Sequence, residues 1–292
     1  MLEINALRNK IQHGQGQNVA SLYYCAVEDI SPPEAIELEA VLDERERERY
    51  RRMSPSVASG FFQGRRMVKQ VIAQLLEVAV TDVRFHYSEN GKPMLALQPR
   101  LHFSISHCPT AIVVLVASCK VGVDVESLER HSTSAEPPWK RPHKFMHKRS
   151  ALWVESAVSD SEKRRLFTLL WTLMESQVKL TDSSIFRASK RLAIDLHCSG
   201  ISNSWGVSGV EFGDGVSADY RKEGQDEWLW RAYEGGGLQG RGHTRDIISL
   251  AYAPCELKLL LYQWVNGEAH TRTALTPIAC SNSLLSAVVS DL

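Results

Sequence analysis

Alternating and continuous apolar positions predict a group of strands in the first half of the chain. The run AIVVLVA at residues 111–117 is wholly apolar, which is typical of a buried strand. Over residues 121–126, valine alternates with glycine, aspartate and glutamate, which is the period of two that a strand gives its side chains. A third strand is predicted over residues 101–106, and the Asn90-Gly91 pair ahead of it indicates a tight turn.

Helices are predicted where apolar residues recur three and four positions apart. In residues 67–76 the apolar residues share one face, while Arg65 and Lys69 lie elsewhere on the helix. Residues 36–53 place acidic and basic residues at helical neighbour spacing, which predicts a solvated helix. Residues 166–180, LFTLLWTLMESQVKL, are apolar on most sides and predict a buried helix whose few polar residues are informative.

A loss of periodicity divides the chain into two halves. Residues 127–141 carry adjacent prolines and no repeating pattern, which predicts an exposed linker between residues 1–127 and residues 128–292. The order of helices and strands is similar in both halves, so we expect an α+β fold. Beyond the second half's main helix, strands are predicted over residues 192–197, 228–233 and 247–253.

Composition narrows the class of protein. The 292 residues are 43% hydrophobic, and 34 basic residues balance 34 acidic ones, so we expect a globular chain without a general attraction to nucleic acid or membrane. No apolar stretch approaches the length of a membrane span, and Glu3 and Arg8 interrupt the place of a signal peptide, which favours the cytoplasm. No C-x-x-C spacing occurs, which predicts free thiols at Cys25, Cys108, Cys119, Cys198, Cys255 and Cys280.

Two pairs of polar residues could carry chemistry. Asp124 and Glu126 lie two apart on a predicted strand, so their carboxylates share one face and together suit Mg²⁺. The alternative is a solvated strand end. Glu175 and Lys179 share a face of the apolar helix, where Glu175 suits a third metal ligand or a base and Lys179 suits a phosphate. The alternative is a simple surface ion pair.

The motifs GVDVE at residues 122–126 and WTLMESQVK at residues 171–179 resemble the paired signatures of the 4′-phosphopantetheinyl transferase superfamily. The length and the two-half layout of the chain also suit the superfamily's larger, monomeric, surfactin-synthetase-activating type. Other segments resemble further blocks of the superfamily in the same order: LDERERERYRR at 42–52, GRRMVK at 64–69, NGKP at 90–93, FSISH at 103–107 and KFMHKRS at 144–150.

The resemblance implies two similar α/β lobes in a pseudo-twofold arrangement, and an enzyme that moves the phosphopantetheine arm of coenzyme A onto a serine of an acyl or peptidyl carrier protein. It implies that adenosine 3′,5′-bisphosphate is released, that Glu175 accepts the serine proton, and that Lys179 stabilises phosphate charge. The implied Mg²⁺ ligands are Asp124, Glu126 and Glu175. The implied contacts to coenzyme A are Arg65, Lys69, Lys92, Ser106 and His107.

Two positions depart from the superfamily's pattern. Met174 replaces the lysine that usually precedes the signature glutamate, and Arg149-Ser150 stand where an acidic residue is common. The substitution at Met174 leaves open an alternative function, a non-catalytic relative that binds coenzyme A or a carrier. A basic patch could dock an acidic carrier or be a solvated turn; it comprises Lys140, Arg141, His143, Lys144, Lys148 and Arg149.

Overall fold

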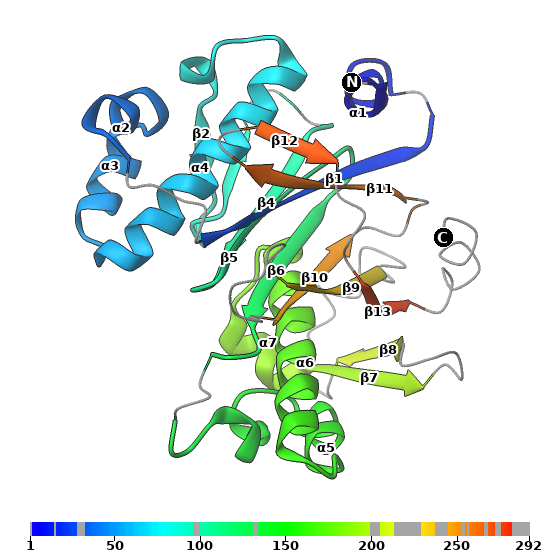
Figure 1. Cartoon of the computed structure of the whole chain (residues 1–292). Coiled ribbons are helices and arrows are strands. Elements are labelled where there is room, and N and C mark those ends of the chain that lie inside the picture. Colours follow the sequence, from blue (N-terminus) through cyan, green and yellow to red (C-terminus); the bar gives the residue numbers. More distant parts are fainter. Residues whose placement is uncertain are drawn as a thin grey trace. The chain divides into compact units, whose positions relative to one another are not determined.

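The computed structural model divides the chain into two compact units, each mixing helices with a sheet (Figure 1). The first unit is Met1–Val125 with Cys255–Thr273, and the second is Glu126–Pro254 with Ala274–Leu292. The chain therefore returns to its first unit late in the sequence. The structure describes residues 2–14, 16–27, 33–95, 98, 100–130, 134–198, 205–212, 229–236, 245–252, 255, 257–265, 268–271 and 276–281.

A five-stranded sheet forms the centre of the first unit, in the order β12-β11-β1-β5-β4. β11 pairs parallel with β1, although the two come from distant parts of the sequence, whereas β5 pairs antiparallel with β1 and β4 (Figure 1). Every residue of β5 is buried, so the predicted buried strand is confirmed. The strands are β1 (Asn18–Ala26), β4 (His102–His107), β5 (Ala111–Ala117), β11 (Leu257–Val265) and β12 (Glu268–Thr271).

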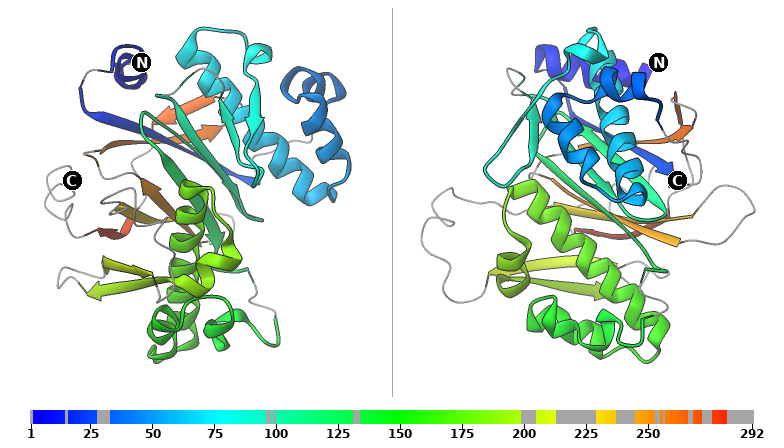
Figure 2. Two further views of the ribbon diagram at one scale, coloured as in Figure 1. Left: turned by 180° about the vertical axis from the view of Figure 1, so that it is seen from behind. Right: turned by 90° about the vertical axis from the view of Figure 1, so that its left-hand side faces the viewer.

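Helix α4 (Pro55–Leu76) packs its apolar face on β4 and β5 (Figure 2). The predicted single helix over residues 36–53 is instead two helices, α2 (Ala35–Val41) and α3 (Glu44–Arg51). The break falls at Asp43, because its side chain caps α3 by accepting a hydrogen bond from the Glu46 backbone N–H at 2.8 Å. The unit's remaining elements are α1 (Leu2–His13), η2 (Val80–Asp82), β2 (Phe85–Tyr87) and β3 (Pro93–Leu95).

The turn predicted from Asn90-Gly91 joins β2 to β3 as a hairpin. Gly91 has a φ of +83°, a left-handed conformation that a residue with a side chain adopts only at a cost. The backbone N–H of Ser88 donates to the carbonyl of Lys92 at 3.0 Å, which closes the turn. Lys92 is therefore held at a defined place in the first unit.

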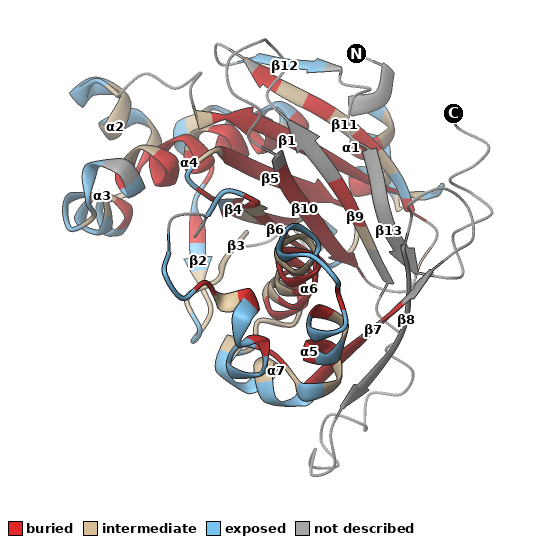
Figure 3. Ribbon diagram, turned by 60° about the horizontal axis from the view of Figure 1, so that its bottom comes forward, coloured by how far each residue is buried: buried red, intermediate tan, exposed pale blue. Residues whose placement is uncertain are grey.

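Helix α6 (Asp160–Thr181) is the main helix of the second unit and packs on β10 (Arg245–Tyr252). Buried residues occur along it from Leu166 to Leu180, as predicted (Figure 3). The Ser159 side chain caps its start, accepting from the Glu162 N–H at 3.1 Å. No helix among the described residues is both long and apolar enough to cross a membrane.

A six-stranded sheet has the order β6-β10-β9-β13-β8-β7, and the boundary between the units falls within β6. The three strands predicted in the second half correspond to β7, β9 and β10. The sequence also predicts a flexible connection over residues 234–243, of which residues 237–243 lie outside the described residues. The other elements are β6 (Val121–Ser127), β7 (Leu192–Cys198), β8 (Trp205–Phe212), β9 (Leu229–Gly236), β13 (Thr276–Ser281), η3 (Pro138–Lys140), η4 (Pro142–Lys144), α5 (Lys148–Glu155) and α7 (Ile185–Arg191).

Candidate functional site

Asp124 is buried on β6 and is oriented by serine side chains of β4. The hydroxyl of Ser104 accepts from the Val123 N–H at 3.0 Å, and the hydroxyl of Ser106 accepts from the Val125 N–H at 3.4 Å. Ser106 then donates its own proton to Asp124 Oδ1 at 2.7 Å. Asp124 is therefore buried and hydrogen-bonded, which excludes the alternative interpretation that it lies at a solvated strand end.

Glu126 lies two residues further along β6 and forms an ion pair with Arg130. Only 12% of the Glu126 side chain is exposed, whereas 47% of the Arg130 side chain is. A neighbouring pair, Glu129 with Arg164 at 3.3 Å, fixes the chain just after the strand. The Glu126 carboxylate is thus sheltered from water, while its cationic partner lies near the surface and can move aside at little cost.

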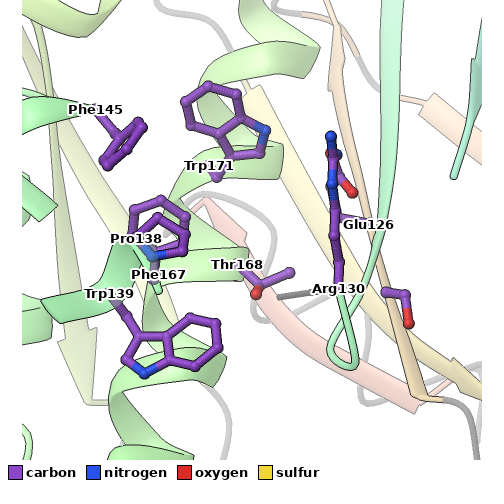
Figure 4. Close-up of a pocket in the computed structure, with 9 residues that line it drawn as sticks. Glu126, Arg130, Pro138, Trp139, Phe145, Phe167, Thr168 and Trp171 are labelled. Atoms are coloured by element: carbon purple, nitrogen blue, oxygen red, sulfur yellow. The ribbon is translucent and has the colours of Figure 1, made fainter. Parts of the chain in front are cut away.

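A cavity of about 260 Å³ lies beside Glu126 in the second unit (Figure 4). One wall is aromatic, and Glu126 and Arg130 lie on the opposite side. The Phe145 and Phe167 rings meet edge to face at 5.9 Å, and Phe167 and Trp171 stack at 6.2 Å. An aromatic wall facing a charged pair suits a ligand with an apolar part and a polar part. The remaining lining residues are Ser127, Pro138, Trp139 and Thr168.

Sequence reasoning missed this cavity, although one signal for it was present. Phe167 and Trp171 are four residues apart on α6, so their rings lie on the same face of the helix. Trp139 and Phe145 belong to the segment around η3 and η4, which starts within the predicted exposed linker. Trp139 is buried, so this segment contributes to the core as well as connecting the two halves.

Glu175 and Lys179 lie one turn apart on α6, and both side chains are half-buried. The helix is fixed to its sheet near this point by a buried contact at 2.7 Å between the hydroxyls of Thr172 and Ser249. Met174, 1% exposed, lies in the apolar core of the second unit with Leu170. Met174 therefore has a structural role in packing the helix.

The three predicted metal ligands are divided between the units, since Asp124 belongs to the first and Glu126 and Glu175 to the second. Their donor set consists only of carboxylate oxygens, which is the chemistry that Mg²⁺ prefers, so these residues fit the ion. Within the part of the chain that the structure describes, no three His, Cys, Asp or Glu side chains are grouped as a metal site. The magnesium site stays a prediction.

Arg65 and Lys69 of α4 are buried around the carboxylate of Glu46. Arg65 Nε lies 2.7 Å from Glu46 Oε1, and Lys69 Nζ lies 2.7 Å from Glu46 Oε2. The hydroxyl of Tyr87 also donates to Glu46, at 3.1 Å. Burial lowers the pKa of Lys69, and the charge of Glu46 opposes that shift. The two cations are therefore not solvated, and their predicted contact with coenzyme A stays a prediction.

Ser106 and His107 are adjacent at the end of β4, in the same unit as Asp124. Ser106 is buried and bonded to Asp124, whereas His107 is exposed. Helix α4 approaches His107 closely at Gly60, where a Cβ atom would lie 3.1 Å from His107 Cδ2. Lys92, the other predicted ligand contact of this unit, is half-buried in the hairpin turn.

Ser150, which departs from the superfamily's acidic pattern, has a structural role. Its hydroxyl accepts from the Ile194 N–H at 2.8 Å and donates to the Ile194 carbonyl at 3.1 Å. The register between β7 and β8 shifts at this point, between Ile194 and Asp195. Ser150 thus satisfies backbone groups of an irregular strand.

Replacing Ser150 with alanine is expected to destabilise the protein by about 1–3 kcal/mol, because buried backbone groups of Ile194 lose their partner. Thermal or urea unfolding measures the change. The matched control is Ser156→Ala, which removes an exposed hydroxyl bonded to the carbonyl of Trp153. Equal stability of the two variants would contradict the role assigned to Ser150.

The predicted basic patch is mostly exposed, but two of its members have acidic neighbours. Arg141 pairs with Glu136, and His143 Nδ1 lies 3.6 Å from Glu155 Oε1. These contacts reduce the local excess of positive charge. Carrier docking by this patch stays a prediction.

Comparison with known proteins finds a family match for part of the chain. Residues 120–223 match the 4′-phosphopantetheinyl transferase superfamily, a segment that contains β6 and α6 with both signature motifs. The resemblance to this superfamily that the motifs indicated is therefore confirmed.

Individual relatives agree with the match. The chain is 26% identical over 123 residues to the 4′-phosphopantetheinyl transferase gsp of Aneurinibacillus migulanus, covering 42% of this chain and 48% of that one. It is 25% identical over 134 residues to Sfp of Bacillus subtilis strain 168, covering 46% and 57%. It is 29% identical over 129 residues to HetI of a Nostoc species, covering 43% and 52%. The chain thus spans about half the length of these curated relatives.

Proposed function

We propose that the chain is a Mg²⁺-dependent 4′-phosphopantetheinyl transferase, which moves the phosphopantetheine arm of coenzyme A to a serine of an apo acyl or peptidyl carrier protein and releases adenosine 3′,5′-bisphosphate. The observation that carries the proposal is the match over residues 120–223, because it contains the carboxylates of β6 and the polar pair of α6. Similar relatives bear the name of this activity.

The proposed roles are those that the resemblance to the superfamily implies, and the type of each side chain is compatible with them. Asp124, Glu126 and Glu175 hold the metal, which when bound neutralises the charge of the coenzyme A pyrophosphate. Glu175 accepts the proton of the attacking serine, which requires a carboxylate within reach of that hydroxyl. Lys179, one turn away on α6, stabilises phosphate charge.

The remaining proposed contacts belong to the first unit. Ser106 orients Asp124, while His107 and Lys92 bind coenzyme A phosphates. The predicted contact of Ser106 with coenzyme A requires its hydroxyl proton to turn away from Asp124. Arg65 and Lys69 are the two further predicted contacts. They also compensate the buried charge of Glu46 and so join α4 to α3. We propose that the protein acts as a monomer on the carrier, a type of partner that serves fatty-acid, polyketide or nonribosomal-peptide synthesis.

The experiment is the intact mass of an apo carrier protein after incubation with this protein, coenzyme A and Mg²⁺. We expect the carrier to gain the mass of one phosphopantetheine, and we expect EDTA to abolish the gain. A carrier variant without the acceptor serine is the control. No gain with any of several acidic carriers, while the protein remains folded, would exclude the activity.

The alternative function, a non-catalytic binding relative, was motivated by Met174. Its burial gives this residue a role in packing that requires no loss of activity. A relative that only binds would retain coenzyme A in equilibrium dialysis and leave every carrier unmodified. The two functions are therefore separated by the same mass measurement.

Replacing Met174 with lysine is expected to lower stability by about 2–3 kcal/mol, because the ammonium group would enter an apolar core. Thermal unfolding of the variant measures this, and Met174→Leu is the volume-conserving control, with an expected cost below about 1.5 kcal/mol. A lysine variant as stable as the parent would show that the side chain at this position can reach water.

A further inference from the structure

Two cysteines of the first unit lie side by side although they are far apart in the sequence. The Sγ atoms of Cys119 and Cys255 are 3.7 Å apart, and 136 positions separate the two residues. Cys119 lies in the turn between β5 and β6, and Cys255 comes just before β11. Both side chains are half-buried, so a small reagent can reach them.

The surroundings of the pair are polar and ordered. Ser118, next to Cys119, accepts from the Val19 N–H at 3.0 Å and donates to Asn18 Oδ1 at 3.3 Å. Lys10 Nζ donates to the Gly14 carbonyl at 3.1 Å and to the Gly16 carbonyl at 2.6 Å, both in the segment that leads into β1. These contacts fix the backbone on the Cys119 side and the start of β1, which pairs with β11 beside Cys255.

The two thiols differ in acidity. The hydrogen bond between Cys255 and Cys119, followed by the Asn18 side chain and the charge of Lys10, lowers the pKa of Cys255 to about 7 despite partial burial. The same contact raises the pKa of Cys119. Cys255 is therefore the thiol that more readily forms the nucleophilic thiolate near neutral pH.

We propose that Cys119 and Cys255 form a site of reversible oxidation, at which a small disulfide such as oxidised glutathione converts the two thiols into one intramolecular disulfide. The sulfurs must approach from 3.7 Å to the bonding distance of about 2.05 Å, which is a movement of less than about 2 Å. The other two free thiols with described side chains, Cys25 and Cys108, are buried.

The reaction balances in two exchange steps. The Cys255 thiolate attacks one sulfur of oxidised glutathione, the sulfur–sulfur bond breaks, and one glutathione leaves with the proton that Cys255 released. Cys119 then loses its proton and attacks the Cys255 sulfur of the mixed disulfide, and the second glutathione leaves and takes up that proton. Two protein thiols are oxidised and one glutathione disulfide is reduced to two thiols.

The disulfide would link two segments of the first unit that are far apart in the sequence. Cys119 precedes the strand that carries Asp124, and Cys255 is the point at which the chain re-enters this unit. The disulfide would close a loop of well over a hundred residues, which restricts the unfolded chain strongly. We therefore expect the oxidised form to unfold at a temperature higher by roughly 5 °C or more.

The experiment treats the reduced full chain with oxidised glutathione and measures intact mass and non-reducing peptide maps. We expect loss of the mass of two hydrogen atoms, a peptide that links Cys119 to Cys255, and reversal by dithiothreitol. In Cys119→Ser, we expect Cys255 to retain one glutathione as a stable adduct, because no neighbouring thiol displaces it. In Cys255→Ser, we expect neither the disulfide nor rapid adduct formation.

The matched control is Cys108→Ser, in which a hydroxyl can keep the contact with Thr110 and the disulfide should form as in the parent. Linkage of either cysteine to another partner, or no intramolecular disulfide at any ratio of oxidised to reduced glutathione, would overturn the proposal. The readout is mass and linkage, so it is independent of whether the chain transfers phosphopantetheine.

Discussion

Replacing Glu46 with glutamine is expected to destabilise the protein by about 3–5 kcal/mol, because it removes one partner from a buried ionic cluster. Glu46 is 1% exposed and is the carboxylate that both Arg65 and Lys69 contact. The variant would leave two cations in a buried environment without their counter-charge. Urea unfolding monitored by circular dichroism measures the loss of free energy.

The control for Glu46 is on the same helix. Glu44 pairs with Arg47 at 2.8 Å, but 66% of the Glu44 side chain is exposed, so Glu44→Gln should cost much less stability than Glu46→Gln. A cost at Glu46 no larger than at Glu44 would show that the cluster does not depend on this carboxylate. A double variant, Glu46→Gln with Lys69→Met, should recover part of the loss, since it removes one of the stranded charges.

Replacing Glu175 with glutamine is expected to reduce phosphopantetheine transfer by about 10²- to 10⁴-fold, the range for loss of a general base. The amide keeps the size of the side chain but neither accepts the serine proton readily nor brings a negative charge to the metal. The half-buried position of Glu175 on a well-packed helix means that the fold should be unaffected. The initial rate of carrier modification, followed by intact mass, measures the effect.

Glu129→Gln is the matched control for Glu175, because Glu129 lies in the same unit and pairs with Arg164 near the surface. That variant should transfer the arm at close to the parent rate. If Glu175→Gln remained as active as Glu129→Gln, the proposed base would be wrong even with the transferase activity established. If Glu175→Gln lost both its activity and its cooperative unfolding transition, the lower activity would be explained by unfolding of the variant.

Local patterns predicted β4, β5, β6 and the main helix of the second unit, but not β1, β11 or β12 of the first unit's sheet. The apolar run of β5 and the apolar face of α6 carry strong periodic signals, and each forms the buried element that its pattern indicates. The Asn90-Gly91 turn was equally readable because few pairs of residues favour that conformation. The predicted catalytic and metal residues rest on the resemblance of short motifs and stay predictions.

Contacts between distant segments were not readable from local patterns. In α3, seven of the eight residues are charged, and nothing in the alternation marks Glu46 as the one that α4 buries. The hydroxyl of Ser150 satisfies backbone groups of Ile194, 44 positions away, which no helical period encodes. The break at Asp43 was missed although its cap with Glu46 has a recognisable spacing, because the charge pattern continues across it.

The parallel pairing of β1 with β11 sets an order of events during synthesis. β1 is synthesised well before its neighbour on one side, which begins with Leu257 opposite Asn18. Until then β1 has an unpaired edge, and such edges attract other chains. The sheet of the first unit is therefore completed only after β11 has been synthesised. Until then, protection of the free edge of β1 would reduce association with other chains.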